Sequence, residues 1–368
     1  MATIKNRVLS PEELEQFGAE LEALKQSQLA DVGEVDARYI KRIVKAVRYT
    51  EFLGRAFLFL SFIPPFWLLG TMLLSLSKIL ENMELGHNVM HGQYDFMNEP
   101  SLNGATYEWD IVGTGDNWRA SHNHMHHTYT NIKGMDDDVG YGLLRLFPEQ
   151  RWSPFFLFQT VYASLLALLF QWGVAIQELQ IGKLFKGKKS WAELREELRP
   201  VTRKINRQLI KDYVIFPLLA GPMFLSVLTG NLVANLVRNV WTFSIIFCGH
   251  FTKDAEIFSK SVLDNETRGH WYLRQLRGSS NLKGGKLFHI LSGNLSHQIE
   301  HHLFPTVPAR RYADMSKGVQ AICKRYGQNY NSDYLHKQFA QVWWRIIRHS
   351  FPSAPSRSAS EGGLQAAA

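Results

Sequence analysis

The sequence predicts an all-α membrane protein with four transmembrane helices, arranged as two hairpins beneath a cytoplasmic helical cap. Three observations lead to this prediction. The 368-residue chain contains several apolar stretches long enough to enter a bilayer. A loop rich in lysine and arginine follows one of them, and eight of the 14 histidines gather in three clusters close to them. Apolar helices and clustered imidazoles together indicate a metal site at a membrane surface.

The first region, residues 1–48, is expected to form amphipathic helices on the cytoplasmic side. It is charged and has no apolar core, so no signal peptide is expected. The string Ser10-Pro11-Glu12-Glu13 combines an N-cap, a proline in the first turn and a capping box, which predicts a helix as far as Gln28. A second helix is expected from Val35 to Tyr49.

The first hairpin is predicted within Ala56–Ser77, a stretch of 22 residues without a charge. About twenty apolar residues cross a bilayer once, but Pro64-Pro65 interrupts this stretch, and a proline pair breaks a helix. One helix is therefore expected up to Ile63. Another is expected from Phe66 onward, continuing into the first histidine cluster.

The second hairpin is predicted from three later apolar stretches: Phe155–Ile176, Tyr213–Leu228 and Asn231–Gly249. Between the first two, ten lysines and arginines lie from Lys183 to Lys211, which places this loop on the cytoplasmic side. Histidine clusters that share one metal site must face the same side of the membrane, so Phe155–Ile176 is expected to be interfacial or re-entrant. The other two stretches then form the hairpin, with an external turn at Thr229-Gly230-Asn231.

The rest of the chain divides at two further boundaries. Residues 49–308 are expected to form the membrane domain with the three clusters, and residues 309–351 to form C-terminal cytoplasmic helices. Residues 352–368 are small and polar and are expected to be disordered.

Composition narrows the class of protein. The net charge of +8 favours an anionic membrane face. The basic residues form no recognisable nucleic-acid-binding motif, so no nucleic-acid partner is expected. Cys248 and Cys323 form neither a disulfide framework nor a thiolate metal site, which fits a protein that faces the cytoplasm.

The three histidine clusters have the spacing of metal ligands on helices. The first is His87-Asn-Val-Met-His91, the second is His122-Asn-His-Met-His126-His127, and the third is Gln298-Ile-Glu-His301-His302. Residues i and i+4 share a helix face, and an adjacent i+5 residue flanks them. Imidazole suits zinc, copper, iron and nickel, but one zinc needs only four ligands. Seven or more imidazoles indicate two metal ions, and such a site at a membrane surface favours oxidative chemistry on a lipid.

Several residues beside the clusters have alternative interpretations. His124 points away from the ligand face of the second cluster, so it is expected either on the surface or beside the ligands without binding a metal. In the third cluster, His297 repeats the spacing of the second, whereas Gln298 gives a Q-x-x-H-H pattern, and both cannot bind a metal equally well on one helix. His250 ends an apolar stretch and is either an interfacial residue or an additional ligand. The acidic run Asp136–Asp138 either hydrogen-bonds ligand imidazoles or is solvated.

Two acidic residues, Asp254 and Glu256, follow the last apolar stretch, and after them comes the group Arg268, Trp271, Arg274 and Gln275. These side chains either hold an anionic headgroup, hold the metal ligands in place, or form an ordinary salt-bridged surface.

The order H-x-x-x-H, H-x-x-x-H-H and Q-x-x-H-H resembles that of the integral-membrane fatty acid desaturases. Two longer strings carry the same resemblance: Trp118-Arg119-Ala-Ser-His122-Asn123 and Gln298-Ile-Glu-His-His-Leu-Phe-Pro305. They are similar to the bacterial acyl-lipid or acyl-CoA branch and its front-end relatives. The match covers Leu85 to Pro308.

This resemblance implies that the helical cap holds a diiron site. It implies insertion of a cis double bond into an acyl chain, carried by CoA or by a lipid, with two non-haem irons, dioxygen and two external electrons. It also implies the inner membrane of a bacterium, with the active site facing the cytoplasm. The implied ligands are His87, His91, His122, His126, His127, His250, His301 and His302. Gln298, His297 and Asp138 are expected beside the metal ions or as further ligands, and His297 ranks below Gln298 because it is not at a ligand position of the family pattern. Trp118, Arg119 and Arg274 are the expected substrate contacts.

The electron donor is expected to be a separate protein. Family members with a fused haem domain carry an H-P-G-G string, which this chain lacks. A ferredoxin or an iron–sulfur flavin reductase is the expected donor, and a basic cytoplasmic face would raise the association rate of an acidic carrier.

Two other classes of protein compete with this interpretation. A membrane diiron hydroxylase or ketolase carries the same clusters, and its chemistry diverges only after the first hydrogen abstraction, by return of a hydroxyl group. The Gln298–Pro305 string favours desaturation. A receptor or transporter with one structural zinc would leave most of these histidines without a function.

Overall fold

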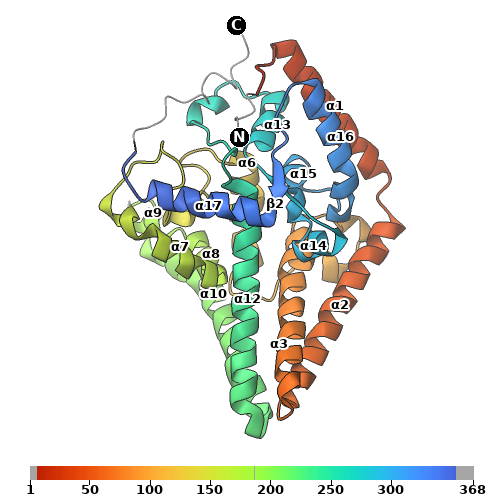
Figure 1. The fold of residues 1–368 in the computed structure, drawn as a ribbon, viewed down its shortest axis with the longest axis vertical. Coiled ribbons are helices and arrows are strands. Elements are labelled where there is room, and N and C mark those ends of the chain that lie inside the picture. The colour runs from red at the N-terminus through yellow and green to blue at the C-terminus, as the bar shows by residue number, and fades with distance from the viewer. Residues whose placement is uncertain (1–5, 186, 354–368) are drawn as a thin grey trace.

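The structure is a computed structural model that describes residues 6–185 and 187–353, and this part of the chain is almost entirely helical. Figure 1 shows long helices running together towards one end of the molecule, with shorter helices gathered around the other end. The long helices are α2 (Glu34–Phe59), α3 (Pro64–Ile79), α10 (Trp191–Ile210) and α12 (Phe224–His250). Two short strands, β1 (Asn281–Lys283) and β2 (Ser332–Tyr334), pair in parallel. The tail predicted at 352–368 lies outside the described residues from residue 354 onward.

Helices α2 and α3 form the predicted first hairpin. The break lies at the proline pair as predicted, but helix α3 begins at Pro64, two residues before the predicted Phe66, because proline is tolerated in the first turn of a helix. The two helices approach closely where each carries a glycine. A Cβ on Gly54 would lie 2.8 Å from the backbone nitrogen of Leu74, and one on Gly70 would lie 2.8 Å from the carbonyl oxygen of Gly54. Any larger side chain at these positions would force the helices apart.

One expectation for this region was wrong. The charged helix predicted at 35–49 and the first arm of the hairpin are a single helix, α2. The boundary placed at residue 48 is therefore not a break in the structure. The physical reason is that no proline lies between Val35 and Phe59, and a change from charged to apolar residues does not interrupt backbone hydrogen bonding.

The second hairpin exists, but its turn lies elsewhere than predicted. Helix α10 continues through the π-helical turn η7 (Lys211–Ile215) and α11 (Phe216–Leu219), and α12 returns beside it. The turn lies at η8 (Gly221–Met223), where Gly221 has a φ of 53° that favours glycine, and a proline follows. The turn predicted at Thr229–Asn231 was wrong, because these residues lie inside α12. Gly230 instead allows close packing on α2: a Cβ there would lie 2.6 Å from Leu58 Cδ2.

The stretch predicted to be interfacial or re-entrant forms α7 (Gln159–Leu168) and α8 (Phe170–Glu178). The helical segments on either side of residue 169 are bent by 100°, so the stretch does not cross a membrane as one straight helix. Among the described residues, the helix Gly221–His250 is long and apolar enough to cross, and the bent pair is a second candidate if it is one span. Four crossings beneath a cytoplasmic cap therefore stay a prediction.

The N-terminal helix joins the core that positions the third histidine cluster. Helix α1 (Pro11–Ala30) begins with the predicted capping box, in which Ser10 Oγ accepts the Glu13 N–H at 3.2 Å. It packs against α13 (Arg268–Arg277) and α16 (Tyr312–Arg325). Phe17, Tyr272 and Tyr312 are fully buried in this core, together with apolar residues of α15 (Gln298–Leu303).

A second core surrounds α12. Phe243 and Phe247 of α12 are fully buried against Phe170 of α8. Helix α17 (Leu335–His349) lies across α12 and adds its own buried apolar face to this core (Figure 1). The remaining short elements are η1 (Leu80–His87), α4 (Asn88–Met90), η2 (Asp95–Met97), η3 (Pro100–Leu102), α5 (Gly115–Trp118), η4 (Arg119–His126), α6 (His127–Tyr129), η5 (Gly140–Gly142), η6 (Pro154–Phe158), α9 (Ile181–Phe185), η9 (Lys260–Leu263), α14 (Lys286–Leu291), η10 (Leu295–His297) and η11 (Ala309–Arg311).

Candidate metal centre

The first histidine cluster lies where α3 continues into the π-helical segment η1. Such π-helical turns are frequent at functional sites. His87 and His91 are buried, and the Nε2 atom of each ring has no hydrogen-bond partner among the described residues. The Oδ1 atom of Asn88 lies 3.1 Å from His87 Nδ1. That nitrogen is thus the donor, and Nε2 is left for a metal ion.

The second cluster also lies on a π-helical segment, η4, which follows α5. Thr114 caps α5 by accepting the Asn117 N–H at 3.3 Å. Residues five apart are neighbours on a π-helix, and the ring centroids of His122 and His127 lie 4.9 Å apart. The structure places His124 on the exposed side of the segment, the first of its two expected positions.

The third cluster lies on α15, where His301 and His302 are fully buried. Gln298 is also buried; its Nε2 lies 2.9 Å from His250 Nε2, and its Oε1 has no partner in the described part of the chain. The competing residue, His297, faces elsewhere: its ring lies 4.5 Å from that of His289. Of the two alternatives, the structure brings Gln298 to the histidine clusters.

In the described residues, the possible ligand atoms of the clusters, of His250 and of Asp138 form four overlapping groups, within each of which the atoms lie no more than 4.8 Å apart. Two of these groups share no residue and contain seven of the eight histidines, and they define two neighbouring sites. Site A comprises His87, His91, His122 and His301, and site B comprises His126, His250 and His302. His127 lies between the sites, with its ring 4.7 Å from that of His301 and 4.5 Å from that of His302. All eight histidines proposed as ligands therefore meet in one place, including the isolated His250.

This arrangement fits metal ions. Both ring nitrogens of His127 and of His301 are buried and have no hydrogen-bond partner in the described residues. The Nε2 atoms of His250 and His302 face each other at 3.1 Å. Buried polar atoms without partners are costly, and a metal ion would satisfy several at once. Burial lowers the pKa of His127, His301 and His302 well below the usual value, which keeps these rings in the neutral form that binds metals.

Two of the three residues in the acidic run hold the second cluster. Both carboxylate oxygens of Asp136 lie 3.0 Å from His126 Nδ1. The Oδ2 atom of Asp138 lies 3.5 Å from His122 Nδ1. Burial by itself would lower the pKa of His126, but the negative charges of Asp136 and Asp138 raise it to about 9. Asp137 instead accepts a hydrogen bond from Gln180 near the surface.

The group that follows α12 also supports the clusters. Arg274 is completely buried and donates two hydrogen bonds to Glu266, at 2.6 and 2.8 Å, and two more to backbone carbonyls at the end of the second cluster. Gln275 donates to the carbonyl oxygen of His127, and its Oε1 lies 3.0 Å from His302 Nδ1. These contacts favour the interpretation in which the group holds the metal ligands. They do not support a substrate contact for Arg274.

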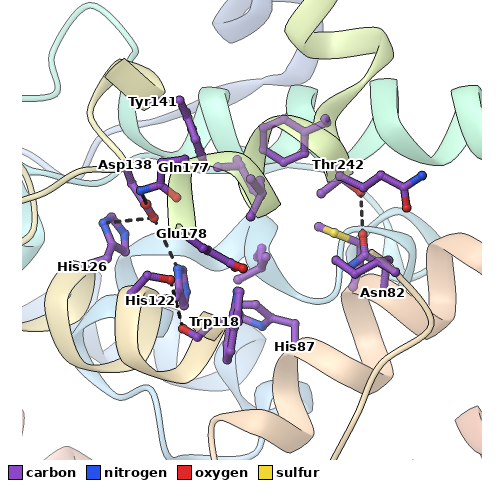
Figure 2. A pocket seen from close by; sticks show the side chains of 18 of the residues that line it. Asn82, His87, Trp118, His122, His126, Asp138, Tyr141, Gln177, Glu178 and Thr242 are labelled. Carbon is purple, nitrogen blue, oxygen red and sulfur yellow. Dashed lines mark hydrogen bonds and ion pairs between the residues drawn. The ribbon is translucent and has the colours of Figure 1, made fainter. Parts of the chain in front are cut away.

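A cavity begins at the sites and extends between α8 and α12 (Figure 2). Trp118 forms part of its wall and stacks on His122, with ring centroids 4.6 Å apart. Away from the histidines, the apolar wall includes Met83, Ile111, Phe170, Val174, Ile246 and Leu295. Arg119 is not part of the wall; it donates to two backbone carbonyls and to Asp116. An acyl chain has the apolar character that this cavity would accept.

Several polar residues of the wall were not predicted from the sequence, among them Asn82, Thr242 and Glu178. Thr242 donates to Asn82 Oδ1 at 3.1 Å across the cavity, as Figure 2 shows. Glu178, the last residue of α8, also lines the cavity. Its position depends on the 100° bend between α7 and α8, and no local pattern in the sequence marks that bend.

Comparison with known proteins identifies the family. The family model described as fatty acid desaturase matches residues 62–334. The NADPH-dependent stearoyl-CoA 9-desaturase of Mycobacterium tuberculosis is 45% identical over 348 residues, which cover 94% of this chain and 82% of that protein. The sn-1 linoleoyl-lipid 6-desaturase of Synechocystis is 28% identical over 304 residues, covering 79% of this chain and 82% of that protein. The acyl-lipid (7-3)-desaturase of Rebecca salina is 27% identical, covering 77% and 63%.

The chain therefore belongs to the fatty acid desaturase family. It is a fatty acid desaturase, an oxidoreductase of lipid metabolism, as the resemblance in its histidine clusters predicted. Membership of this family implies iron and dioxygen, and the grouped histidines are able to bind metal.

Proposed function

We propose that this protein inserts a cis double bond into the acyl chain of a fatty acyl-CoA, using two iron ions, dioxygen and two external electrons. The observation that carries this proposal is the meeting of two groups of buried imidazoles with an apolar cavity that begins at them. The acyl-CoA class is supported by the mycobacterial relative, whose name specifies stearoyl-CoA.

Sites A and B would each hold one iron. In this assignment the ligands of site A are His87, His91, His122 and His301, and those of site B are His126, His250 and His302, with His127 between the sites and the Gln298 amide group beside site B. Bound iron would supply the activation of dioxygen and the removal of hydrogen from an unactivated methylene, which no amino-acid side chain performs.

The side chains of the protein hold the ligands and shape the cavity. Asp136 and Gln275 fix the rings of His126 and His302 through the Nδ1 atoms, so that each Nε2 is directed at the centre. Trp118 closes the wall beside His122. The apolar walls would exclude water and hold each methylene at a set distance from the sites, and that distance determines which carbon reacts.

The electron donor we propose is a separate ferredoxin or iron–sulfur flavin reductase. The mycobacterial relative is named NADPH-dependent, which fits a reductase that takes its electrons from NADPH. We further propose that residues 49–308 cross the bacterial inner membrane four times, with the clusters and residues 309–351 on the cytoplasmic side. The basic run from Lys183 to Lys211 supports this orientation.

Expression in a bacterial host together with such a reductase, followed by gas chromatography and mass spectrometry of the cellular fatty acids, tests this function. We expect a new monounsaturated chain, and iron analysis of the purified protein should give two irons per chain. His301→Ala should insert into the membrane but form no product, whereas His124→Ala, altered at an exposed ring, should remain active. A hydroxylated product in place of the alkene would overturn the proposal in favour of a hydroxylase. Normal product from His301→Ala would overturn the ligand assignment.

A further inference from the structure

Glu178 places a carboxyl group without a partner in the wall of the cavity. It is the last residue of α8, and only 7% of its surface is exposed. Neither carboxyl oxygen has a hydrogen-bond partner in the described part of the chain. Figure 2 shows this side chain reaching into the space bordered by His122, His126 and His87. It belongs to none of the groups of possible metal ligands in the described residues.

The surroundings of Glu178 favour the neutral carboxylic acid. A buried carboxylate without hydrogen bonds or a paired cation is strongly disfavoured. The charged groups that act on it are Asp138, Lys204 and Glu108, and the two carboxylates outnumber the one ammonium. The other carboxyl group in the cavity wall, Asp138, is occupied by Gln177 and lies beside the rings of His122 and His126. Glu178 is thus the carboxyl group of the wall that is free to give up a proton.

A short connection leads from Glu178 to the outside of the protein. A Cβ added to Gly113 would lie 3.1 Å from Glu178 Oε2, so this glycine lies directly against the carboxyl group. The carbonyl oxygen of Gly113 accepts a hydrogen bond from Lys204 Nζ at 2.5 Å. Lys204 also pairs with Glu108, whose side chain is 47% exposed. One glycine therefore separates the buried acid from an ion pair in contact with solvent.

The reaction creates a need for such a connection. Desaturation converts R–CH2–CH2–R′, O2, two electrons and two protons into R–CH=CH–R′ and two molecules of water. Two of the four hydrogens in the water come from the substrate, and the other two must come from solvent. The cavity is walled largely by apolar side chains, which cannot carry protons. A proton-conducting group must therefore enter it.

We propose that Glu178 carries protons from the Lys204–Glu108 pair into the cavity. This inference rests on the proposed function above. In each transfer the Glu178 carboxylic acid gives its proton to oxygen as the external electrons reduce it, and the resulting carboxylate takes a proton from the Lys204 ammonium group through water beside Gly113. Solvent then reprotonates the pair, so charge and protons balance over one turnover. Glu178 is the proton donor, and Lys204 and Glu108 supply it.

The first test uses metal-free protein and does not depend on activity. The infrared difference spectrum of wild type minus Glu178→Gln should contain the carbonyl band of one buried carboxylic acid at neutral pH, because the bands of other buried acids such as Glu300 cancel. Glu196→Gln, altered at an exposed residue of α10 that pairs with Arg199, is the matched control, and its difference spectrum should contain no such band. A difference spectrum for Glu178→Gln without a carbonyl band would overturn the proposal even if the protein proves to be an active desaturase.

The second test uses the iron-loaded enzyme with its reductase. Glu178→Gln should bind the same amount of iron as wild type but form product about 100-fold more slowly, with a larger solvent deuterium isotope effect and release of peroxide. Glu178→Asp, which keeps a carboxyl group, should recover part of the rate. Loss of iron in Glu178→Gln would show a structural or ligand function and overturn the proposal, as would an unchanged rate and isotope effect. Failure of wild type to form an alkene would instead overturn the proposed function.

Discussion

Asp136 holds the ring of His126 with both of its carboxylate oxygens, each 3.0 Å from Nδ1. The same carboxylate accepts the backbone N–H groups of Asn131, at 2.8 Å, and of Asp138, at 3.0 Å. These backbone hydrogen bonds hold the Asp136 carboxylate in the position from which it contacts the His126 ring. A carboxylate on Nδ1 selects the tautomer that presents Nε2 to a metal and makes that nitrogen more basic.

Asp136→Asn should weaken metal binding without unfolding the protein. The amide keeps the size of the carboxyl group but loses its charge, and loss of such a partner typically lowers metal affinity about 10- to 100-fold. Iron content after dialysis against a chelator, measured beside product formation, checks this. Asp137→Asn is the matched control, since that side chain binds Gln180 near the surface. Equal iron retention in the two variants would show that Asp136 does not support the ligand.

His250→Ala should remove iron from site B and leave site A occupied, because this histidine faces His302 and Gln298 in site B. We expect the iron content to fall by half and product to be absent. His297→Ala should keep both irons, since that ring packs on His289 instead. If His297→Ala loses iron while Gln298→Ala keeps it, the assignment of the third cluster must be reversed.

The sequence predicted the histidines of the site better than the structure around them. Ligand spacing is local, so the pattern of each cluster can be recognised in the sequence. His250 lies outside the clusters, and its position left two interpretations open until the family resemblance implied that it is a ligand. The π-helical register of η1 and η4 was not predicted, because it depends on packing as well as on spacing. Gln275 was one of a group with three interpretations, and Glu178 was not singled out. Both reach the site through long-range contacts, which spacing does not encode.

The turns of the fold show the same contrast between local signals, which the sequence predicted correctly, and long-range contacts, which it did not. The proline pair marked the first turn correctly because proline acts on its own neighbours. The second turn was misplaced because Thr229-Gly230-Asn231 has the composition of a turn. In the structure, tertiary contact overrides that local preference, and Gly230 serves the close approach of α12 to Leu58.

Asp212→Asn should strongly destabilise the protein. Asp212 is 1% exposed and accepts hydrogen bonds from Lys78 Nζ at 2.7 Å and Arg55 Nη2 at 3.3 Å, which joins the first hairpin to the arm that continues α10. Removing one partner of a buried ionic group typically costs about 3–5 kcal/mol, because uncompensated charge remains. Thermal unfolding in detergent measures the effect. Asp314→Asn is the control: its pair with Lys317 is exposed and should contribute less than about 1 kcal/mol. Equal melting temperatures for the two variants would contradict this.

The contact between the start of α2 and the C-terminal region should weaken in acid. Asp36 is buried and accepts hydrogen bonds from Arg310 at 2.7 Å and Arg311 at 2.7 Å. Burial by itself would raise the pKa of Asp36, but hydrogen bonds from Arg311 and the Gly33 N–H, and the charge of Arg310, lower it below its usual value.

Because the pKa of Asp36 is lower in the folded than in the unfolded chain, its contribution to stability is complete above the unfolded value of about 3.9 and is lost as the pH falls through the folded value. The difference in melting temperature between wild type and Asp36→Asn should therefore be largest near neutral pH and shrink below about pH 4. Thermal unfolding of both proteins in detergent, over a series of buffers from neutral to acid, measures this difference. A difference that stays constant into acid would show that the charge of Asp36 does not stabilise the contact.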